Sequence, residues 1–325
     1  MGQALAASRC GSLRPAARLL LICGEEGELI NESMKTFDMP NHVLVTGASS
    51  GIGLALCRVL VRDHDCHVLL GARDASKGQA CLRSILSEIA GAEGKIEVLI
   101  IDVTDDTSVA AAAASIQSKG ITLYALVNNA GVGLAQPGAP NNPLAILDTN
   151  LYGVKRVTEA MVPLIDPIHG RIVNVSSGAA SAYVKTQDAA TKALFSRPPS
   201  WEALDTGVQR AVAGNNVGLG NGYGLSKAAL SAFTVIQSRM YPNLKVVSLS
   251  PGFIDTPMTA GFGAKLSPEQ GCRSSIKCLF DAVTSGFYYG SDGLRSPLTM
   301  TRDPGMPEFQ GEEEPLEQTY NRPSV

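Results

Sequence analysis

The sequence predicts an α/β fold built on a single doubly wound parallel sheet. From His42 to Leu249, short apolar runs alternate with longer helical patterns, which is typical of repeated βαβ units. Each apolar run ends in a cluster of small or polar residues, and open α/β sheets bind ligands beyond these carboxyl ends. Glycine is abundant, with 33 residues, while aromatic residues make up 5% of the chain, which favours close helix–sheet packing over a β-sandwich.

The expected elements follow one another regularly along the chain. Apolar, β-rich runs predict strands over 42–46, 67–70, 96–101, 123–127, 171–175 and 245–249. Helical patterns cover 51–62, 75–89, 105–118, 144–165 and 223–240. The stretch 178–222 interrupts this alternation, since Ser200 is a candidate N-cap for an amphipathic helix whose apolar face begins at Trp201. We therefore expect a helical insertion at 178–222, over the rim of the sheet.

One domain is predicted over residues 41–298, flanked by segments of different composition. Residues 1–40 carry arginines but no acid before Glu25, which is typical of an organellar transit segment. A disordered extension or an imperfect gene start is an equally good interpretation. We accordingly expect a cytoplasmic protein, or a mitochondrial or plastid one if residues 1–40 are a transit segment. Residues 299–325 contain four prolines and little apolar material, so we expect a disordered tail there.

The composition excludes several classes of protein. Apolar residues make up 45% of the chain, enough for a large core and too many for a mainly disordered protein. The net charge of −3 and the lack of a basic block argue against a nucleic-acid partner. The longest apolar runs, 19–23 and 98–101, are far shorter than the ~20 residues that cross a bilayer, so we expect no transmembrane segment.

The cysteines and histidines indicate neither disulfides nor a metal. The seven cysteines are odd in number and form no C-x-x-C pair, which favours unpaired thiols in a reduced compartment. The cluster His64-Asp65-Cys66-His67 contains ligand residue types, but nothing downstream completes a site. We predict no metal.

The segment Thr46–Gly53 has the residues of a phosphate-binding turn between a strand and a helix. Gly47 permits a sharp turn, Gly51 leaves room for a pyrophosphate, and Gly53 lets the helix pack closely on the strand. The same residues match the G-x-S-x-G elbow of α/β-hydrolases, which are an alternative. A hydrolase would need a histidine late in the chain, and none follows His169.

Arg73 stands at the end of the second predicted strand, where an acidic residue would bind the ribose 2′-hydroxyl of NAD. A guanidinium there can pair with the 2′-phosphate of NADP, which a carboxylate would repel. Lys77 can assist, whereas the neighbouring Asp74 leaves room for NAD. A solvated arginine at a helix start is the purely structural interpretation. We predict NADPH as the cofactor and consider NADH the less favoured one.

Tyr223 and Lys227 are four residues apart in a predicted helix and therefore share one face. A free tyrosine has a pKa near 10, and a nearby ammonium favours the phenolate and lowers that pKa. A phenol so placed can give a proton to a carbonyl oxygen, or take one in the reverse reaction. The pattern Y-x-x-x-K is common on helix surfaces, so its weight depends on the other motifs.

Together these motifs make the chain resemble the short-chain dehydrogenase/reductase family, and within it the carbonyl-reductase-like members, over roughly residues 41–298. The motifs occur in the family's order, each at a predicted strand end or helix start. They are Thr46–Gly53, Asp102-Val103, Asn128-Asn129-Ala130-Gly131, Asn150, Asn174-Val175-Ser176-Ser177, Tyr223–Lys227 and Pro251–Thr256. The resemblance implies a Rossmann-type sheet with the helical insertion between the catalytic serine and tyrosine.

The resemblance also implies a catalytic tetrad of Asn150, Ser177, Tyr223 and Lys227. Ser177 would hydrogen-bond the substrate carbonyl, and Tyr223 would be the general acid–base. Lys227 would hold the nicotinamide ribose and bias Tyr223, while Asn150 would bind the water that links Lys227 to solvent. The implied cofactor-binding residues are Gly47, Ser49, Ser50, Gly51, Ile52, Gly53, Arg73, Asp102, Val103, Asn129, Gly131, Tyr223, Lys227, Pro251, Gly252, Ile254 and Thr256.

Two departures from the family pattern matter. NADP-dependent members often have a basic residue where this chain has Ser50, so the NADP prediction depends on Arg73. Tyr223 follows Ser177 by 46 residues (223 − 177), far more than in ordinary members. Carbonyl-reductase-like proteins are similar in carrying a helical insertion here, which covers the surface used for tetramer formation in other members. The resemblance therefore implies a monomer rather than a tetramer.

We expect an NADPH-dependent reductase of ketones or aldehydes, which acts by direct hydride transfer on a small-molecule carbonyl substrate with Tyr223 as proton donor. Two alternatives stay open. One is a non-catalytic NADP(H)-binding sensor or scaffold with the same fold. The other is an alcohol dehydrogenase that works in the oxidative direction.

Overall fold

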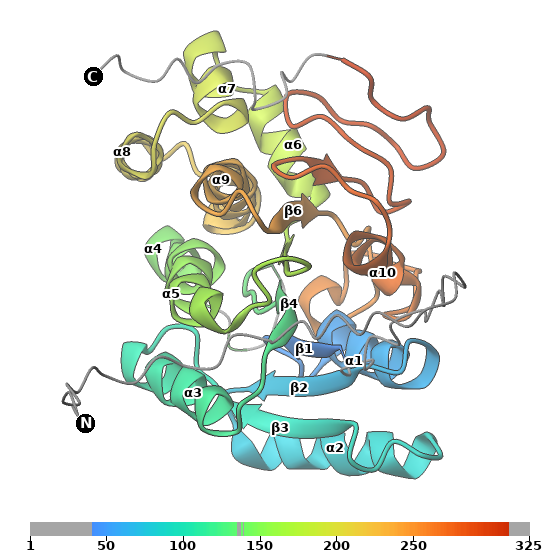
Figure 1. Ribbon diagram of the computed structural model, residues 1–325. Helices are drawn as coiled ribbons and strands as arrows, with labels where there is room; N and C mark the ends of the chain where they lie inside the picture. Colours follow the sequence, from blue (N-terminus) through green and yellow to red (C-terminus); the bar gives the residue numbers. More distant parts are fainter. Residues whose placement is uncertain (1–40, 135–137, 139, 312–325) are drawn as a thin grey trace, which may run out of the picture. The chain divides into compact units, whose positions relative to one another are not determined.

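The computed structural model describes residues 41–134, 138 and 140–311 (Figure 1). In this part of the chain the strands form one seven-stranded parallel sheet in the order β3-β2-β1-β4-β5-β6-β7. The strands are β1 (His42–Val45), β2 (His67–Ala72), β3 (Ile96–Ile100), β4 (Leu123–Asn128), β5 (Arg171–Val175), β6 (Lys245–Leu249) and β7 (Tyr288–Tyr289). This order confirms the predicted doubly wound sheet, and β7 is an edge strand that the sequence pattern did not indicate.

Helices cover both faces of the sheet because the strands are apolar on both sides. On β1, Val43 and Val45 belong to the core on one face, whereas Leu44 belongs to the core on the other. The first face carries α1 (Gly51–Asp63), α2 (Ala75–Glu88) and α10 (Arg273–Phe280), and the second carries α3 (Asp106–Ser118), α5 (Gly153–Met161) and α9 (Leu219–Met240) (Figure 1). Strand order reverses between β1 and β4, so ligand binding is expected beyond the carboxyl ends of these two strands.

The helix predicted over 144–165 is present but contains a π-helical turn. It runs through α4 (Pro143–Leu147), the π turn η1 (Asp148–Tyr152), α5 and the 3-10 turn η2 (Val162–Leu164). Short π-helical segments inside helices frequently lie at functional sites, and this one carries Asn150. The last long helix, α9, adopts regular helical geometry only from Tyr223 on, because Gly220, Asn221 and Gly222 have left-handed φ values.

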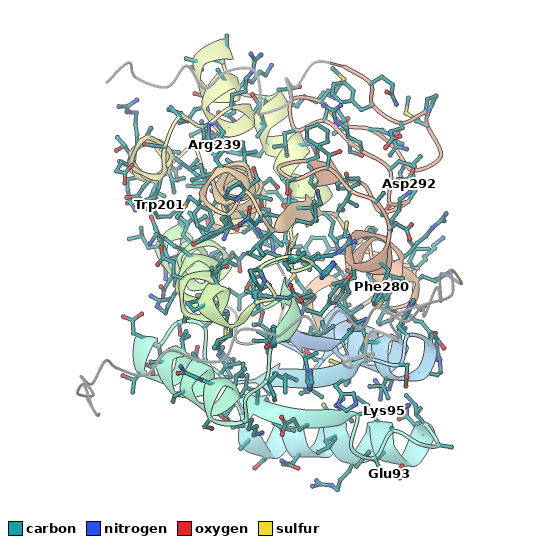
Figure 2. All side chains as sticks on the ribbon, viewed as in Figure 1. Glu93, Lys95, Trp201, Arg239, Phe280 and Asp292 are labelled. Atoms are coloured by element: carbon teal, nitrogen blue, oxygen red, sulfur yellow. The ribbon has the colours of Figure 1, made fainter. Side chains whose placement is uncertain are left out.

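The insertion between Ser177 and Tyr223 is helical, as predicted. It consists of α6 (Gly178–Lys185), α7 (Ala189–Ser196) and α8 (Trp201–Ala213), which pack on α9 (Figures 1 and 2). The ring of Trp201 lies 5.0 Å from that of Phe233 on α9, centroid to centroid. Phe195 is fully buried in the same core, with its ring 5.7 Å from that of Tyr183. Because of this cover, α9 is buried on all sides from Gly222 to Ser238.

Side chains beyond the predicted domain end at residue 298 contact the domain. Arg302 donates to both carboxylate oxygens of Asp292, at 3.0 and 2.7 Å. The guanidinium carbon of Arg295 lies 3.8 Å from the ring centroid of Phe287 and 5.3 Å from that of Phe309. Arg302 and Phe309 therefore contact residues of the domain (Asp292 is labelled in Figure 2), while the boundary at 298 and the disordered tail stay predictions. The segment 1–40 and the rest of the tail, 312–325, lie outside the described residues. Within the described chain, no helix has the length and hydropathy to cross a membrane.

Candidate active site

The glycine-rich turn joins β1 to the N-terminus of α1, as the motif predicts. Gly47 and Gly51 have φ values of +63° and +54°, which other residues rarely adopt. A Cβ atom on Gly53 would lie 2.4 Å from the side-chain nitrogen of Asn129, so only glycine fits there. Ser50 is the N-cap of α1, but its side chain accepts no capping hydrogen bond and the first turn contains no acid. This helix end therefore keeps the positive character that binds phosphate.

Asn129 links the loop after β4 to the glycine turn. Its side-chain nitrogen donates to the carbonyl oxygens of Thr46 and Gly47 at 2.8 and 3.2 Å. The Thr46 hydroxyl in turn accepts from the main-chain N–H groups of Asn129 and Ala130, both at 3.1 Å. The Asn129 side chain is thus used to fix the shape of the crevice at the point where strand order reverses.

Arg73 lies exposed at the end of β2, and its charge acts on Asp102 beyond β3. Burial of Asp102 raises the pKa of its carboxyl, but hydrogen bonds from Thr104 and the charge of Arg73 outweigh burial, so the pKa falls below its usual value. Asp74 accepts a hydrogen bond from the main-chain nitrogen of Lys77 at 3.0 Å and so caps α2. Within the part of the chain described, the Arg73 guanidinium forms no hydrogen bond or ion pair with protein groups.

The other predicted adenine neighbour, Val103, is buried, and its carbonyl oxygen accepts from Arg156 on α5 at 2.7 Å. This bond ties the loop after β3 to the helix that follows the π turn.

Tyr223 and Ser177 meet at the carboxyl ends of the strands. Tyr223 begins the regular part of α9 and is 7% exposed, while the Ser177 hydroxyl caps α6 by accepting from Ala179 at 3.1 Å. Burial raises the pKa of the Tyr223 phenol. A hydrogen bond from the Ser177 hydroxyl acts in the opposite direction and limits that rise. In the ligand-free chain burial is the larger effect, so the pKa of the Tyr223 phenol lies above its usual value. The lowering of this pKa by Lys227 stays a prediction.

Lys227 is nearly fully buried one helical turn after Tyr223. Its Nζ lies 5.7 Å from the centroid of the Tyr223 ring and donates to the carbonyl oxygen of Val175 at 2.8 Å. Burial lowers the pKa of this ammonium to about 8. A Cβ atom on Gly131 would lie 3.3 Å from the Lys227 Nζ and 3.4 Å from the Oδ1 of Asn150, so these three residues converge.

Asn150 is held rigidly on its π turn. Its Oδ1 accepts from the main-chain nitrogen of Val132 at 2.9 Å, and its Nδ2 donates to the Val132 oxygen at 3.0 Å and to the hydroxyl of Ser226 at 2.9 Å. Asn150 therefore ties the loop after β4 to the start of α9. The structure thus brings the four predicted tetrad residues together around one loop junction.

The loop after β6 closes the far side of the crevice. Gly252 has a φ of +97°, and the side chain of Ile254 is buried under Gly271, where a Cβ would lie 2.9 Å from it. A Cβ atom on Gly51 would lie 3.4 Å from the methyl group of Thr256, which places the end of this loop beside the glycine turn. The predicted cofactor residues at the two loops are thus neighbours in space.

Two contacts around the tetrad were missed at the sequence level. A Cβ atom on Gly133 would lie 2.7 Å from the Tyr223 ring, so glycine at this position is needed for the ring's placement. The hydroxyl of Ser176 bonds to the Lys227 carbonyl oxygen at 2.9 Å and to the Ser231 hydroxyl at 2.8 Å, and so orients α9. Ser176 belongs to one of the motifs and Gly133 closely follows another. The sequence does not show that either residue contacts α9.

Comparison with known proteins identifies the family. The model for short chain dehydrogenases matches residues 41–194. (−)-Isopiperitenone reductase from Mentha piperita is 29% identical over 308 residues, which cover 78% of this chain and 98% of that protein. Carbonyl reductase 1 (NADPH) from Homo sapiens is 31% identical over 72% of this chain and 89% of its own. The solved structure of salutaridine reductase from Papaver somniferum matches with a TM-score of 0.66 and 26% identity, over 77% of this chain and 99% of that one.

The chain belongs to the short-chain dehydrogenase/reductase family. It is therefore an oxidoreductase of a family that binds a nicotinamide cofactor. The described residues of this dehydrogenase/reductase fit such a group. The glycine turn has the left-handed conformations and the uncapped helix end that a pyrophosphate requires, and Lys227 uses one of its three N–H donors on a protein group.

Two surface cavities lie away from the tetrad. One, of about 640 Å³, is formed by the ends of α1 and α2, and the other, of about 500 Å³, lies between α1 and α10. Among the predicted site residues, Pro251 lines the second cavity, and the first contains none of them.

Proposed function

We propose that this protein is an NADPH-dependent reductase that converts a ketone or aldehyde to an alcohol, with Tyr223 as the general acid. One observation carries the proposal: the buried phenol ring of Tyr223 lies 5.7 Å from the buried ammonium of Lys227, at the strand ends that also carry Ser177. A protonated phenol is the form needed to give a proton to a carbonyl oxygen.

Each side chain has a separate task in this proposal. The bound cofactor supplies the hydride that reduces the carbonyl carbon. The Ser177 hydroxyl donates a hydrogen bond to the substrate oxygen and polarises the carbonyl. Tyr223 gives its proton to that oxygen as negative charge develops on it. Lys227, cationic below pH of about 8, stabilises the phenolate that remains.

NADPH is favoured over NADH by the surroundings of Arg73. The guanidinium is exposed and has no ion-pair partner among the described residues, so it is available for a 2′-phosphate. The competing carboxylate of Asp74, which would favour NADH, is engaged as the cap of α2. Ser50 adds no charge, so the preference depends on Arg73.

We also propose that the enzyme is a monomer. Helices α6, α7 and α8 cover α9, and the Tyr152 hydroxyl donates to Asp205 at 2.6 Å, which fixes α8 on the neighbouring helix. A second chain would have to displace this cover to reach α9. Light scattering during size-exclusion chromatography tests the proposal, since a tetramer at micromolar concentration contradicts it.

The proposed activity is tested with a panel of quinones, aromatic aldehydes and ketones, each offered with NADPH and with NADH. We expect oxidation of NADPH with at least one compound and formation of the matching alcohol. Tyr223→Phe should lower kcat by a factor of about 100 or more while NADPH still binds. Tight NADPH binding without turnover of any compound in either direction would refute the proposal and indicate a sensor.

A further inference from the structure

The hydroxyl of Ser250 connects the loop that carries Ser177 to the loop that follows β6. Its oxygen accepts from the main-chain nitrogen of Gly178, the residue after Ser177, at 3.1 Å. The same oxygen accepts from the main-chain nitrogen of Gly252 at 3.3 Å. Ser250 is 7% exposed, so these two N–H groups depend on the serine rather than on bulk water.

The backbone of Ser250 is fixed from two further directions. Its main-chain nitrogen donates to the carbonyl oxygen of Tyr289 on β7 at 2.8 Å, and its carbonyl oxygen accepts from the hydroxyl of Ser274 on α10 at 3.0 Å. The hydroxyl group therefore starts from a rigid position at the end of β6. It can hold two loops in register because its own main chain is bonded to β7 and α10.

A buried phenol adjoins this hydroxyl. Tyr288 on β7 is 4% exposed, and burial raises the pKa of its phenol to about 12, while interactions with the hydroxyls of Ser250 and Ser181 oppose the rise. An oxygen that accepts two N–H groups still has its own proton to donate.

We propose that Ser250 is a positioning residue for the reduction. Ser250 holds the Ser177 hydroxyl in place for the substrate oxygen and holds the loop 251–256 in place for the nicotinamide end of the cofactor. This inference rests on the proposed function, and it assigns to one side chain an effect on both the chemical step and cofactor affinity.

The test compares variants that keep or remove the hydroxyl. Ser250→Ala leaves the N–H groups of Gly178 and Gly252 without an acceptor, so we expect kcat to fall and the Kd for NADPH to rise, each on the order of tenfold. Ser250→Thr retains the acceptor and should recover most of both losses. Tyr288→Phe leaves both accepted bonds in place, so its effect should be smaller, about two- to threefold.

Ser285→Ala is the matched control. The Ser285 hydroxyl accepts from the main-chain nitrogen of Val246 at 2.9 Å, at the opposite end of β6. Its loss removes the same kind of bond from the same strand, far from the tetrad. It should lower the melting temperature and leave kcat and the NADPH Kd unchanged.

Hydrogen exchange of the unliganded chain supplies a readout that needs no substrate. Peptides that cover Gly178 and Gly252 should exchange faster in Ser250→Ala than in the wild type, and Ser285→Ala should not change them. If no carbonyl compound is reduced but exchange and NADPH affinity respond as described, the proposed function fails and the positioning role for the cofactor loop stands. An active enzyme whose kcat and NADPH Kd are unaltered by Ser250→Ala, or a Thr variant no better than Ala, overturns the inference.

Discussion

Replacement of Lys227 by methionine should stabilise the protein at neutral pH while it abolishes turnover. The ammonium is 3% exposed, and burial lowers its pKa from 10.5 to about 8. A fall of that size corresponds to about 3 kcal/mol of folding free energy spent on keeping the charge in the core. A methionine side chain is of similar length and carries no charge. It does not form the hydrogen bond to the Val175 oxygen, which contributes about 1 kcal/mol.

The net expected gain is therefore about 2 kcal/mol, or about 4–8 °C in melting temperature for a domain of this size. The gain must depend on pH with a definite sign. The folded pKa lies below the unfolded one, so the wild type carries the full penalty below pH of about 8 and loses it as pH rises toward 10.5. The difference in Tm between Lys227→Met and wild type should narrow over that range.

Thermal melts of both proteins between pH 6 and 10 measure this directly. Lys245→Met is the control, because Lys245 is an exposed lysine at the start of β6 and its replacement should give no difference of this kind. A Lys227→Met protein that melts below the wild type at pH 7, or a difference that does not change with pH, would refute the reasoning. It would mean that the ammonium is stabilised in the ligand-free chain by more than the Val175 carbonyl.

Three further predictions concern cofactor choice, the glycine turn and the C-terminal segment. Arg73→Asp should lower kcat/KM for NADPH about tenfold or more relative to NADH, and an unchanged ratio in steady-state assays would exclude Arg73 as the selector. Gly53→Ala places a Cβ 2.4 Å from the Asn129 side chain, so it should destabilise the fold by about 1–3 kcal/mol and weaken NADPH binding, measured by melting and fluorescence titration. Arg302→Ala removes the cation that, with neighbouring N–H groups, outweighs burial and holds the pKa of Asp292 at about 2, which should cost about 3 kcal/mol above pH 4. Melts from pH 3 to 7 test this, since in the wild type the contribution is lost as pH falls toward 2.

The sequence was sufficient for the order of the elements and for the motifs at the strand ends. Buried parallel strands are recognisable in the sequence as apolar runs. Gly47 and Gly51 adopt the left-handed conformations that the strand-to-helix turn requires. The four-residue spacing of Tyr223 and Lys227 placed both on one helix face, and the structure has them there. Such features depend on residues close together in the sequence, so they can be recognised without knowledge of the tertiary contacts.

What the sequence could not provide depends on contacts between distant segments. The sign of the Tyr223 pKa shift follows from burial of the phenol, and Gly133 packs on its ring from a loop 90 positions earlier (223 − 133). Residues 299–311 have the composition of a disordered tail, yet Arg302 donates a hydrogen bond to Asp292, a contact that composition does not indicate. Strand β7 has two residues and therefore gives no periodic signal.

Neutral side chains join the loops of the site, so its two cations, Lys227 and Arg73, are not needed to hold the loops together. Thr46, Asn129, Asn150 and Ser250 link the strand ends by hydrogen bonds to main-chain groups, without charge. Lys227 can then act at the tetrad end and Arg73 at the end of β2, without disturbing that framework. Replacement of Arg73 should therefore change which dinucleotide binds, while kcat with the preferred dinucleotide is retained. Replacement of Lys227 should abolish turnover and leave a fold that is more stable than that of the wild type.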